Sequence, residues 1–493
     1  MTDRPRRPAG VALASLLPGA PGSATVTGVS LDSRRIAPGD LYVGLPGQRA
    51  HGAAFAADAA RAGAIALLTD AAGAALAADA GLPLLVVDDP RTAMAAIAAD
   101  VHGRPASRLD CFAVTGTNGK TSTVFLLEAA LTALGRRVAT VGTIGFRVGG
   151  QPIEATRSTI TTPESPDLQA LLARMVDGGA DTLAMEVSSH ALALARVDAI
   201  DFDAAAFTML GQDHLEFHHT MEHYFAAKAT LFTQGRTRHG VVNTADPWGV
   251  RLAELVRADG RARLVTTQAP DADYRVVAAE PDAGGGWRVR LHHPGGETEF
   301  RLSMLGEFNV ANAVTALALV GAAGGDVAVA ASGLADAQVP GRMQRVELGP
   351  RRPHVVVDFA HTPQAVAAAL AALPHTGRRI AVLGAGGDRD PSKRGPMGEA
   401  AARNADLVVV TDDNPRSEEP ATIRNAVLAG ARGHGAEVVD GGDRASAIAL
   451  ALGRAAAGDW VAVLGKGHEQ GQDIGGRISP FDDVAVVREA GEV

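Results

Sequence analysis

The chain has 493 residues, of which 46% are hydrophobic and 20% are charged, and its formal net charge is −9. Because a domain typically holds about 100 to 200 residues, about three domains with sizeable cores are expected, and wholesale disorder is excluded. The negative charge argues against general binding to nucleic acid or anionic lipid, which requires clustered cations. The single cysteine, Cys111, excludes an intrachain disulfide and a multi-cysteine metal site and favours the cytoplasm.

The N-terminus combines a basic stretch with an apolar run that is too short for a secretory signal, so Val11 to Leu17 is predicted as the first helix. No later run reaches the roughly 18 apolar residues of a membrane span, and none is expected. Short β-branched runs alternate with alanine-rich helical stretches along the chain, as in buried parallel strands joined by crossover helices. The predicted class is therefore α/β.

Three domains are predicted, with boundaries at 1–108, 109–338 and 339–493. The central domain is expected to contain a mostly parallel sheet of the P-loop type, with α/β domains on either side of it in the chain. An insertion at Tyr274 to Leu302 alternates apolar and polar residues, which indicates antiparallel strands.

The sharpest local motif is CFAVTGTNGKTSTVF. An apolar strand ends at Thr115, Gly116 and Gly119 allow a tight turn, and Lys120 and Thr121 open a helix. Such a turn directs backbone N–H groups at a phosphate, while the lysine reaches the terminal phosphates and the threonine can ligate magnesium. The spacing departs from G-x-x-x-x-G-K-[ST], since Val114 stands at the first glycine position. The alternative is an ordinary glycine turn.

Two further groups of polar residues stand at expected strand or loop ends. Glu186 and His214 are candidate magnesium ligands, although a lone residue of either kind is more often a satisfied polar group. In the last domain, Arg389 and Arg416 with the acidic Asp413 and Glu469 suit a zwitterionic ligand, which needs both signs of charge. A solvated salt-bridge cluster explains these four residues equally well.

Together these segments resemble the Mur ligases, ATP-dependent amide-forming enzymes of peptidoglycan precursor synthesis, over essentially the whole chain. Within the family they are most similar to the ligases that add the third residue of the stem peptide. The resemblance implies a UDP-sugar-binding domain at 1–108, an ATP-binding domain at 109–338 and an amino-acid-binding domain at 339–493. It also implies Mg²⁺ as cofactor and ATP as co-substrate.

The resemblance assigns ligand contacts position by position. For ATP it nominates Gly116, Thr117, Asn118, Gly119, Lys120, Thr121, Ser122 and Asn309, with the stretch Asp358 to His361 facing the nucleotide. For the UDP-sugar peptide it nominates Leu31, Ser33, Gln48, Arg49, Ala50, Thr161, Thr162, Ser188 and Arg196. Two positions depart from some relatives, because Ile160 and Leu194 stand where those carry Asn and Gln.

The resemblance also names the catalytic and metal-binding groups. Lys228 aligns with a lysine that the family carbamylates to N6-carboxylysine, whereas by itself it would be taken for a surface lysine on a helix. The implied catalytic residues are Lys120, Glu186, His214 and Lys228, and the implied metal ligands are Thr121, Glu186, His214 and Lys228 as its carbamate.

The segment DNPR, Asp413 to Arg416, resembles the signature of ligases that add meso-2,6-diaminopimelate. The implied contacts are Arg389, Asp413, Asn414, Pro415, Arg416, Gly465 and Glu469. Diaminopimelate differs from lysine by a second carboxylate, which a fixed guanidinium can bind bidentately. Lysine-adding relatives lack this arginine, so Arg416 is predicted to select the substrate.

The expected reaction joins meso-diaminopimelate to the D-Glu γ-carboxylate of UDP-N-acetylmuramoyl-L-Ala-D-Glu through an acyl phosphate, in a cytoplasmic monomer. One alternative is a folylpolyglutamate synthetase-like ligase, which shares the ATP loop but lacks the DNPR and LDSR segments. Another is a P-loop regulator that no longer ligates, which retention of the catalytic set opposes. No residue is assigned as the base for the incoming amine.

Overall fold

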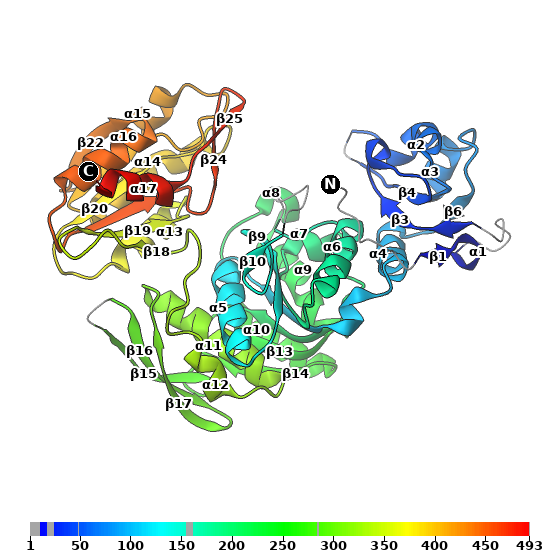
Figure 1. Ribbon diagram of the computed structural model, residues 1–493, viewed down its shortest axis with the longest axis horizontal. Coiled ribbons are helices and arrows are strands. Elements are labelled where there is room, and N and C mark those ends of the chain that lie inside the picture. The colour runs from blue at the N-terminus through cyan, green and yellow to red at the C-terminus, as the bar shows by residue number, and fades with distance from the viewer. Residues whose placement is uncertain (1–9, 17–23, 48, 154–160, 283–284, 493) are drawn as a thin grey trace. The chain divides into compact units, whose positions relative to one another are not determined.

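The computed structural model describes residues 10–16, 24–47, 49–153, 161–282 and 285–492 (Figure 1). Its contacts divide the chain into two compact units. The first comprises Met1–Arg275, His292–Thr298 and Val314–Gly333, and the second comprises Val276–Leu291, Glu299–Ala313 and Leu334–Val493. Among the described residues, no helix has the length and apolar character that crossing a bilayer requires.

The first described segment differs from the predicted helix Val11 to Leu17. Val11–Ala12 forms strand β1, which pairs antiparallel with β2, Thr25–Val26, and only Leu13–Leu16 is helical, as α1. Leu17 lies outside the described residues. The prediction was wrong for the first two residues because their strand partner comes from a later segment, which local periodicity does not reveal.

A four-stranded parallel sheet follows, in the order β3-β4-β5-β6. Its strands are Gly28–Ser30, Asp40–Gly44, Ala66–Thr69 and Leu84–Val86. Helix α2, Ala56–Ala62, packs on one face, while α4, Pro90–Val101, packs on the other. Asp89 begins α4 by accepting hydrogen bonds from the N–H groups of Arg91 and Thr92.

The central sheet has eight strands in the order β10-β9-β8-β11-β7-β12-β13-β14. Six are mutually parallel, and β9 and β10 extend the sheet as an antiparallel edge. In that spatial order the strands are Gln151–Pro152, Gly145–Val148, Val138–Gly142, Thr182–Glu186, Asp110–Thr115, Phe202–Phe207, Thr237–Asn243 and Arg263–Thr267. The carboxyl ends of β7, β11 and β12 therefore meet at one edge, where ligands of such sheets bind.

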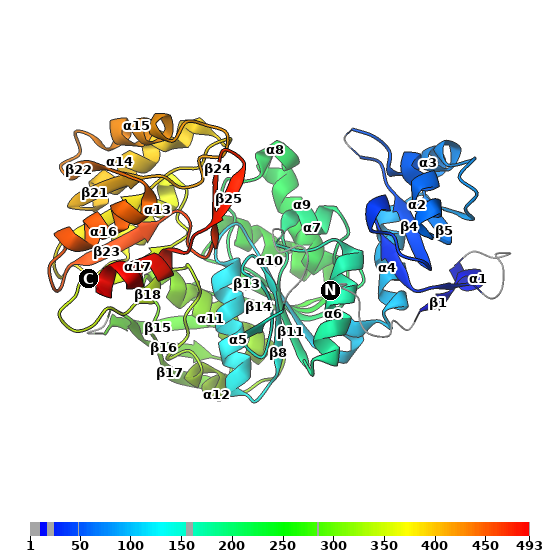
Figure 2. The same cartoon turned by 45° about the horizontal axis from the view of Figure 1, so that its top comes forward.

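Helices cover both faces of this sheet. On one face α5, Lys120–Ala133, packs on β7, β8 and β11 and against α12, Val327–Ser332. The other face carries α6, α9 and α10, at Ser165–Asp177, Met221–Thr233 and Pro247–Asp259. Figure 2 shows β8 and β11 between α5 and α6. Because both faces are covered, the central strands β7, β8 and β11 are buried along nearly their whole length and show no alternation of buried and exposed residues.

A small three-stranded sheet forms the expected insertion, in the order β15-β16-β17. Its strands are Arg275–Pro281, Trp287–His293 and Gly296–Leu302. Only two residues join β16 to β17, and a connection this short links antiparallel neighbours. Helix α11, Glu307–Ala322, follows.

The C-terminal sheet has six strands in the order β18-β19-β23-β20-β21-β22, with β18 as its antiparallel edge. In that order they are Gln344–Val346, His354–Asp358, Trp460–Leu464, Arg379–Leu383, Leu407–Thr411 and Glu437–Gly442. One face packs on α13, α14 and α15, which are Pro363–Ala371, Arg394–Asn404 and Pro420–Ala431. The other face packs on α16, Arg444–Arg454, and α17, Asp483–Glu492. The predicted α/β class is confirmed.

A fully buried ion pair joins α16 to α17. The guanidinium of Arg444 donates to both carboxylate oxygens of Asp483 at 2.7 Å, and both side chains are 0% exposed. Arg444 also donates to the carbonyl of Leu464 at the end of β23, at 3.0 Å. The pair therefore fixes the C-terminal helix beside the strand end that precedes Gly465.

We expect Asp483→Asn to lower the unfolding free energy of this domain by about 3 kcal/mol, because it leaves the buried Arg444 charge uncompensated. Hydrogen exchange of the β23 amides measures this change. Glu489→Gln removes the same charge from an exposed position of α17 and serves as the control. Equal exchange rates in the two variants would show that the pair does not stabilise the domain.

Candidate active site

The phosphate-loop motif occupies the junction between β7 and α5. Gly116 and Gly119 have φ values of 145° and 89°, which favour glycine. A Cβ at Gly116 would also collide with the hydroxyl oxygen of Thr208. The loop therefore needs glycine at both positions, as the motif predicted. Thr121 and Ser122 follow in the first turn of α5 and are buried.

Residues that follow β12 form hydrogen bonds with this loop. The Thr208 hydroxyl donates to the carbonyl of Asn118 at 2.6 Å, and Thr117 N–H donates to the carbonyl of Met209 at 2.8 Å. Gly211 N–H donates to the Thr117 hydroxyl at 2.9 Å. Sequence reasoning missed Thr208, whose only signal is its position directly after an apolar strand.

The amines of Lys120 and Lys228 converge on one carbonyl oxygen. Lys120 Nζ donates to the carbonyls of Gly116 and Thr117 at 2.9 Å, and Lys228 Nζ donates to that of Gly116 at 3.0 Å. Lys228 is 1% exposed, so the surface-lysine interpretation is wrong. Burial, and then the nearby charge of Lys120, lowers the pKa of Lys228 well below its usual range. This environment favours the neutral amine.

Glu186 ends β11 next to the phosphate loop and is 1% exposed. Its carboxylate accepts hydrogen bonds from the Thr121 hydroxyl at 3.0 Å, from Thr143 N–H at 2.8 Å and from the Thr143 hydroxyl at 3.0 Å. A Cβ at Gly142 would collide with this carboxylate. Sequence reasoning missed Gly142, the last residue of the apolar strand β8, and Thr143, which follows it.

His214 belongs to a neighbouring aromatic group. Its ring lies 4.9 Å from that of His190 and 6.1 Å from that of Tyr224, between ring centroids. Tyr224 also contacts the phosphate loop, because its hydroxyl lies 3.1 Å from that of Thr117, and its ring lies 4.5 Å from Lys228 Nζ. The structure thus joins His214 to Lys228 through Tyr224, but it shows no hydrogen bond from His214 to Glu186.

Chemically, these groups suit a hard cation. Thr121 and Glu186 place a hydroxyl and two carboxylate oxygens together, and Mg²⁺ prefers oxygen ligands. Within the described ranges, no group of three or more His, Cys, Asp or Glu side chains is arranged to hold a metal. The predicted ligand set therefore depends on the threonine hydroxyl and the modified lysine as well as on Glu186 and His214.

The nominated peptide contacts gather at the end of β11. The Thr162 hydroxyl donates to the carbonyl of Glu186 at 2.9 Å and accepts from Ser188 N–H at 3.2 Å. Arg196 donates to the carbonyl of Thr162 at 3.1 Å and forms an ion pair with Glu164, which sequence reasoning missed. Thr161 is nearby, with its hydroxyl 3.2 Å from that of Thr143. Ile160 lies outside the described residues.

The nominated UDP-sugar contacts that the structure describes lie in two loops, which follow β3 and β4 of the N-terminal sheet. Leu31 is partly buried against the core after β3, and Ser33 begins a short 3-10 helix capped by Asp32. Arg49 and Ala50 are exposed in the loop after β4, while Gln48 lies outside the described residues. The described contacts therefore lie beyond the carboxyl ends of β3 and β4, which are neighbours in the sheet.

The nominated amino-acid contacts meet at the carboxyl ends of β20, β21 and β23. Gly386 lies between two arginines, since a Cβ there would lie 3.0 Å from Arg416 Nη1 and 3.8 Å from Arg389 Cγ. Gly465 follows β23 with φ 113°, and its missing Cβ leaves room for Asp413, whose Oδ2 would lie 2.6 Å away. Both signs of charge are therefore present around these glycines.

The DNPR segment itself is held by its neighbours. Asn414 Nδ2 donates to Glu469 Oε2 at 2.8 Å, and the carbonyl of buried Pro415 accepts from Glu418 N–H at 3.1 Å. Arg416 adopts a left-handed φ of 53° and donates from Nη1 to the carbonyl of Gly387 at 2.5 Å. Among the described residues, its Nε and Nη2 atoms have no hydrogen-bond acceptor, so part of the guanidinium fork is available to a ligand.

The two remaining nominated nucleotide contacts, Asn309 and Asp358, belong to the second compact unit. Asn309 is fully buried near the start of α11, where its Nδ2 donates to the carbonyl of Leu305 at 2.8 Å. Asp358 ends β19, and its carboxylate accepts from Met343 N–H at 2.7 Å. Burial raises the pKa of Asp358. These contacts hold Asn309 against the segment that precedes α11 and Asp358 against the segment that precedes β18.

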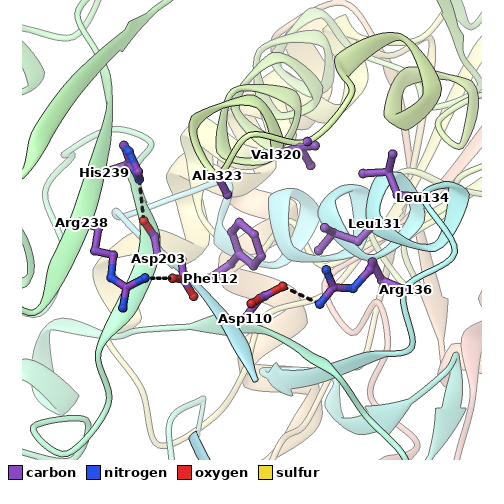
Figure 3. A pocket seen from close by; sticks show the side chains of 11 residues that line it. Asp110, Phe112, Leu131, Leu134, Arg136, Asp203, Arg238, His239, Val320 and Ala323 are labelled. Atoms are coloured by element: carbon purple, nitrogen blue, oxygen red, sulfur yellow. Dashed lines mark hydrogen bonds and ion pairs between the residues drawn. The ribbon is translucent and has the colours of Figure 1, made fainter. Parts of the chain in front are cut away.

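A cavity of about 390 Å³ opens at the opposite end of the central sheet, by the amino ends of β7, β12 and β13 (Figure 3). Its charged groups are paired with one another, Arg136 with Asp110 and Arg238 with Asp203. Because ligands of parallel sheets bind at the carboxyl ends of the strands, this cavity is distinct from the candidate site.

Comparison with known families and proteins covers most of the chain. Residues 25–102, 114–320 and 341–467 match, respectively, the Mur ligase family catalytic domain, the Mur ligase middle domain and the Mur ligase glutamate ligase domain. The UDP-N-acetylmuramoyl-L-alanyl-D-glutamate--2,6-diaminopimelate ligase of Streptomyces coelicolor is 48% identical over 480 residues, covering 95% of this chain and 93% of that protein.

Solved structures agree with this match. A structure of UDP-N-acetylmuramoyl-L-alanyl-D-glutamate--2,6-diaminopimelate ligase superposes with a TM-score of 0.72 at 31% identity and covers 98% of this chain and 99% of that one. Folylpolyglutamate synthase of Mycobacterium tuberculosis reaches a TM-score of 0.60 at 22% identity, covering 76% of this chain and 92% of its own, which shows a shared fold alone. The chain belongs to the Mur ligase family.

Proposed function

We propose that the chain is an ATP-dependent, ADP-forming ligase that joins meso-2,6-diaminopimelate to the D-Glu γ-carboxylate of UDP-N-acetylmuramoyl-L-Ala-D-Glu, the MurE-type reaction. The observation that carries this proposal is the convergence of Lys120 and Lys228 on the Gly116 carbonyl, beside the Thr121–Glu186 pair. The similarity to named diaminopimelate ligases over nearly the whole chain supports the substrate assignment.

The chemistry must overcome the low reactivity of a carboxylate toward amines. The γ-carboxylate of the dipeptide attacks the γ-phosphorus of ATP, which gives an acyl phosphate and ADP. The amine of diaminopimelate then attacks the acyl carbon, loses a proton, and phosphate leaves from the tetrahedral intermediate. Lys120 stabilises the charge on the transferring phosphoryl group, where most of the rate gain in such reactions arises.

The donor set fits magnesium, and Thr121, Glu186, His214 and a carbamate on Lys228 would hold it. When bound, Mg²⁺ offsets the negative charge of the ATP phosphates. The burial of Lys228, which lowers the pKa of its amine, supports the carbamate assignment, because only an unprotonated amine adds carbon dioxide, with loss of one proton, to form an anionic carbamate.

We assign the three ligands to three domains in chain order. Residues 1–108 take the UDP-sugar through contacts that include Leu31 and Ser33, 109–338 take ATP through contacts that include Lys120, and 339–493 take the amino acid through contacts that include Arg416. The three separate family matches support these boundaries. A cytoplasmic location agrees with the single buried cysteine and with the need for ATP.

Phosphate release with one substrate omitted at a time tests the proposal. We expect release only when ATP, Mg²⁺, the UDP-muramoyl dipeptide and diaminopimelate are all present. Slow hydrolysis that ignores both the dipeptide and the amino acid would instead support the nucleotide-binding regulator. Release stimulated by a folate and glutamate would support the folylpolyglutamate synthetase-like alternative.

A further inference from the structure

Lys466 is a buried cation in the C-terminal domain to which neither the sequence analysis nor the proposed reaction assigns a role. It follows β23 by two positions, and its side chain is 0% exposed. Its ammonium donates to Asn414 Oδ1 at 3.3 Å, to Glu469 Oε2 at 3.1 Å and to the carbonyl of Gly471 at 2.6 Å. An ammonium has three N–H donors, and all three are used.

Two of these partners are nominated amino-acid contacts, and they also bind each other. Asn414 Nδ2 donates to Glu469 Oε2 at 2.8 Å, which closes a ring of three side chains with Lys466. Glu469 Oε2 thus accepts two hydrogen bonds, whereas Oε1 has no hydrogen-bond donor among the described residues. The ring therefore fixes the carboxylate through one oxygen and leaves the other for an ammonium group of a ligand.

The third partner connects Lys466 to Arg416. Gly471 begins β24, Gly471–Ile474, which pairs with β25, Arg477–Pro480, in a hairpin (Figure 1). Arg416 N–H donates to the carbonyl of Asp473 at 2.9 Å, and Gly475 N–H donates to that of Arg416 at 2.6 Å. These two bonds hold Arg416 in its left-handed conformation, which is uncommon for a residue other than glycine.

We propose that Lys466 is a positioning residue for the diaminopimelate pocket: its ammonium sets the Glu469 carboxylate on one side and, through the β24 backbone, the Arg416 guanidinium on the other. It touches no substrate. The inference rests on the proposed function and deepens it. In this pocket the separation between the Glu469 carboxylate and the Arg416 guanidinium selects an amino acid that carries a second carboxylate at its far end.

The test compares Lys466→Met with the wild-type enzyme. Methionine keeps an unbranched side chain of similar length but donates no hydrogen bond. We expect the KM for diaminopimelate to rise about 10- to 100-fold, the KM for ATP to stay within about twofold, and the preference for diaminopimelate over lysine to fall. Val487→Ala is the control, because it removes buried volume from α17 and so destabilises the same domain without contacting the ring, and its KM for diaminopimelate should stay within about twofold of the wild-type value.

A buried cation can also be needed for folding alone. If Lys466→Met does not fold, Lys466→Gln carries the test, since its amide retains two N–H donors but no charge, and the same rise in the KM for diaminopimelate is expected. An unchanged KM for diaminopimelate, or equal changes in the KM values for ATP and diaminopimelate, would overturn the inference. A wild-type enzyme that adds no diaminopimelate would overturn the proposed function instead, so the two failures are distinguishable.

Discussion

Lys120→Ala is expected to lower kcat for tripeptide formation by about 10³-fold while leaving the chain folded. The lysine amine lies against the turn that receives the phosphates, and fixed positive charge on a transferring phosphoryl group is worth about this much in related reactions. Rapid-quench measurement of ADP and of the UDP-linked product reports the loss. The KM for diaminopimelate should change little, since this residue is proposed to act on ATP.

Arg137→Met provides the control for that experiment. It removes a cation from an exposed position just beyond the opposite end of α5, where Arg137 donates to the carbonyl of Gly178. Its activity should remain within about twofold of the wild-type value, because surface substitutions of this kind have small effects. A Lys120→Ala enzyme that retained more than about a tenth of wild-type kcat would contradict the assigned role of this lysine.

Arg416→Ala is expected to raise the KM for diaminopimelate about 10- to 100-fold, with the KM for ATP unchanged. A hydrogen bond to a charged group is worth about 1.5 to 3 kcal/mol, and about 1.4 kcal/mol corresponds to a factor of ten. Arg416→Lys should fail in the same way, because an ammonium cannot reproduce the bidentate fork. Steady-state kinetics with each substrate varied in turn distinguishes the two KM values.

Arg403→Ala is the matched control for Arg416. It removes an exposed arginine of the same domain, which pairs with Glu399 on α14. Both KM values should match those of the wild-type enzyme. If Arg416→Ala raised the KM values for ATP and diaminopimelate equally, the amino-acid pocket would lie elsewhere in the domain.

The fold class followed from the sequence because its signals are local. Uninterrupted apolar runs such as Cys111 to Val114 can be buried on both faces of a parallel sheet, and glycines mark where such strands end. Strand β1 escaped prediction because it is defined by pairing with Val26, which local periodicity does not encode. The order of strands in each sheet was likewise not predictable from residue patterns alone.

The candidate site shows the same division between local and tertiary information. The phosphate loop was predicted because its glycines, lysine and threonine are contiguous. Thr143, Gly142 and Thr208 were missed because their roles arise only when the ends of separate strands meet. Lys228 is nominated only through the family resemblance, since nothing in its helix shows that the amine is buried against the loop.

Lys466 could not be identified from the sequence, although it lies between two nominated residues. Its neighbours Gly465 and Glu469 were nominated through the family resemblance, whereas Lys466, between them, was not. A lysine in a loop is usually exposed, so the residue pattern carries no sign that this side chain is buried. Only the hydrogen bonds to Asn414, Glu469 and Gly471 show that it organises this part of the domain.

The most direct test supplies the purified protein with ATP, Mg²⁺, UDP-N-acetylmuramoyl-L-Ala-D-Glu and equal concentrations of lysine and meso-diaminopimelate, and then weighs the UDP-linked product by mass spectrometry. The account predicts a diaminopimelate-containing tripeptide, with one ADP and one phosphate released for each product molecule. A lysine-containing product, or ATP consumption without any tripeptide, would contradict it.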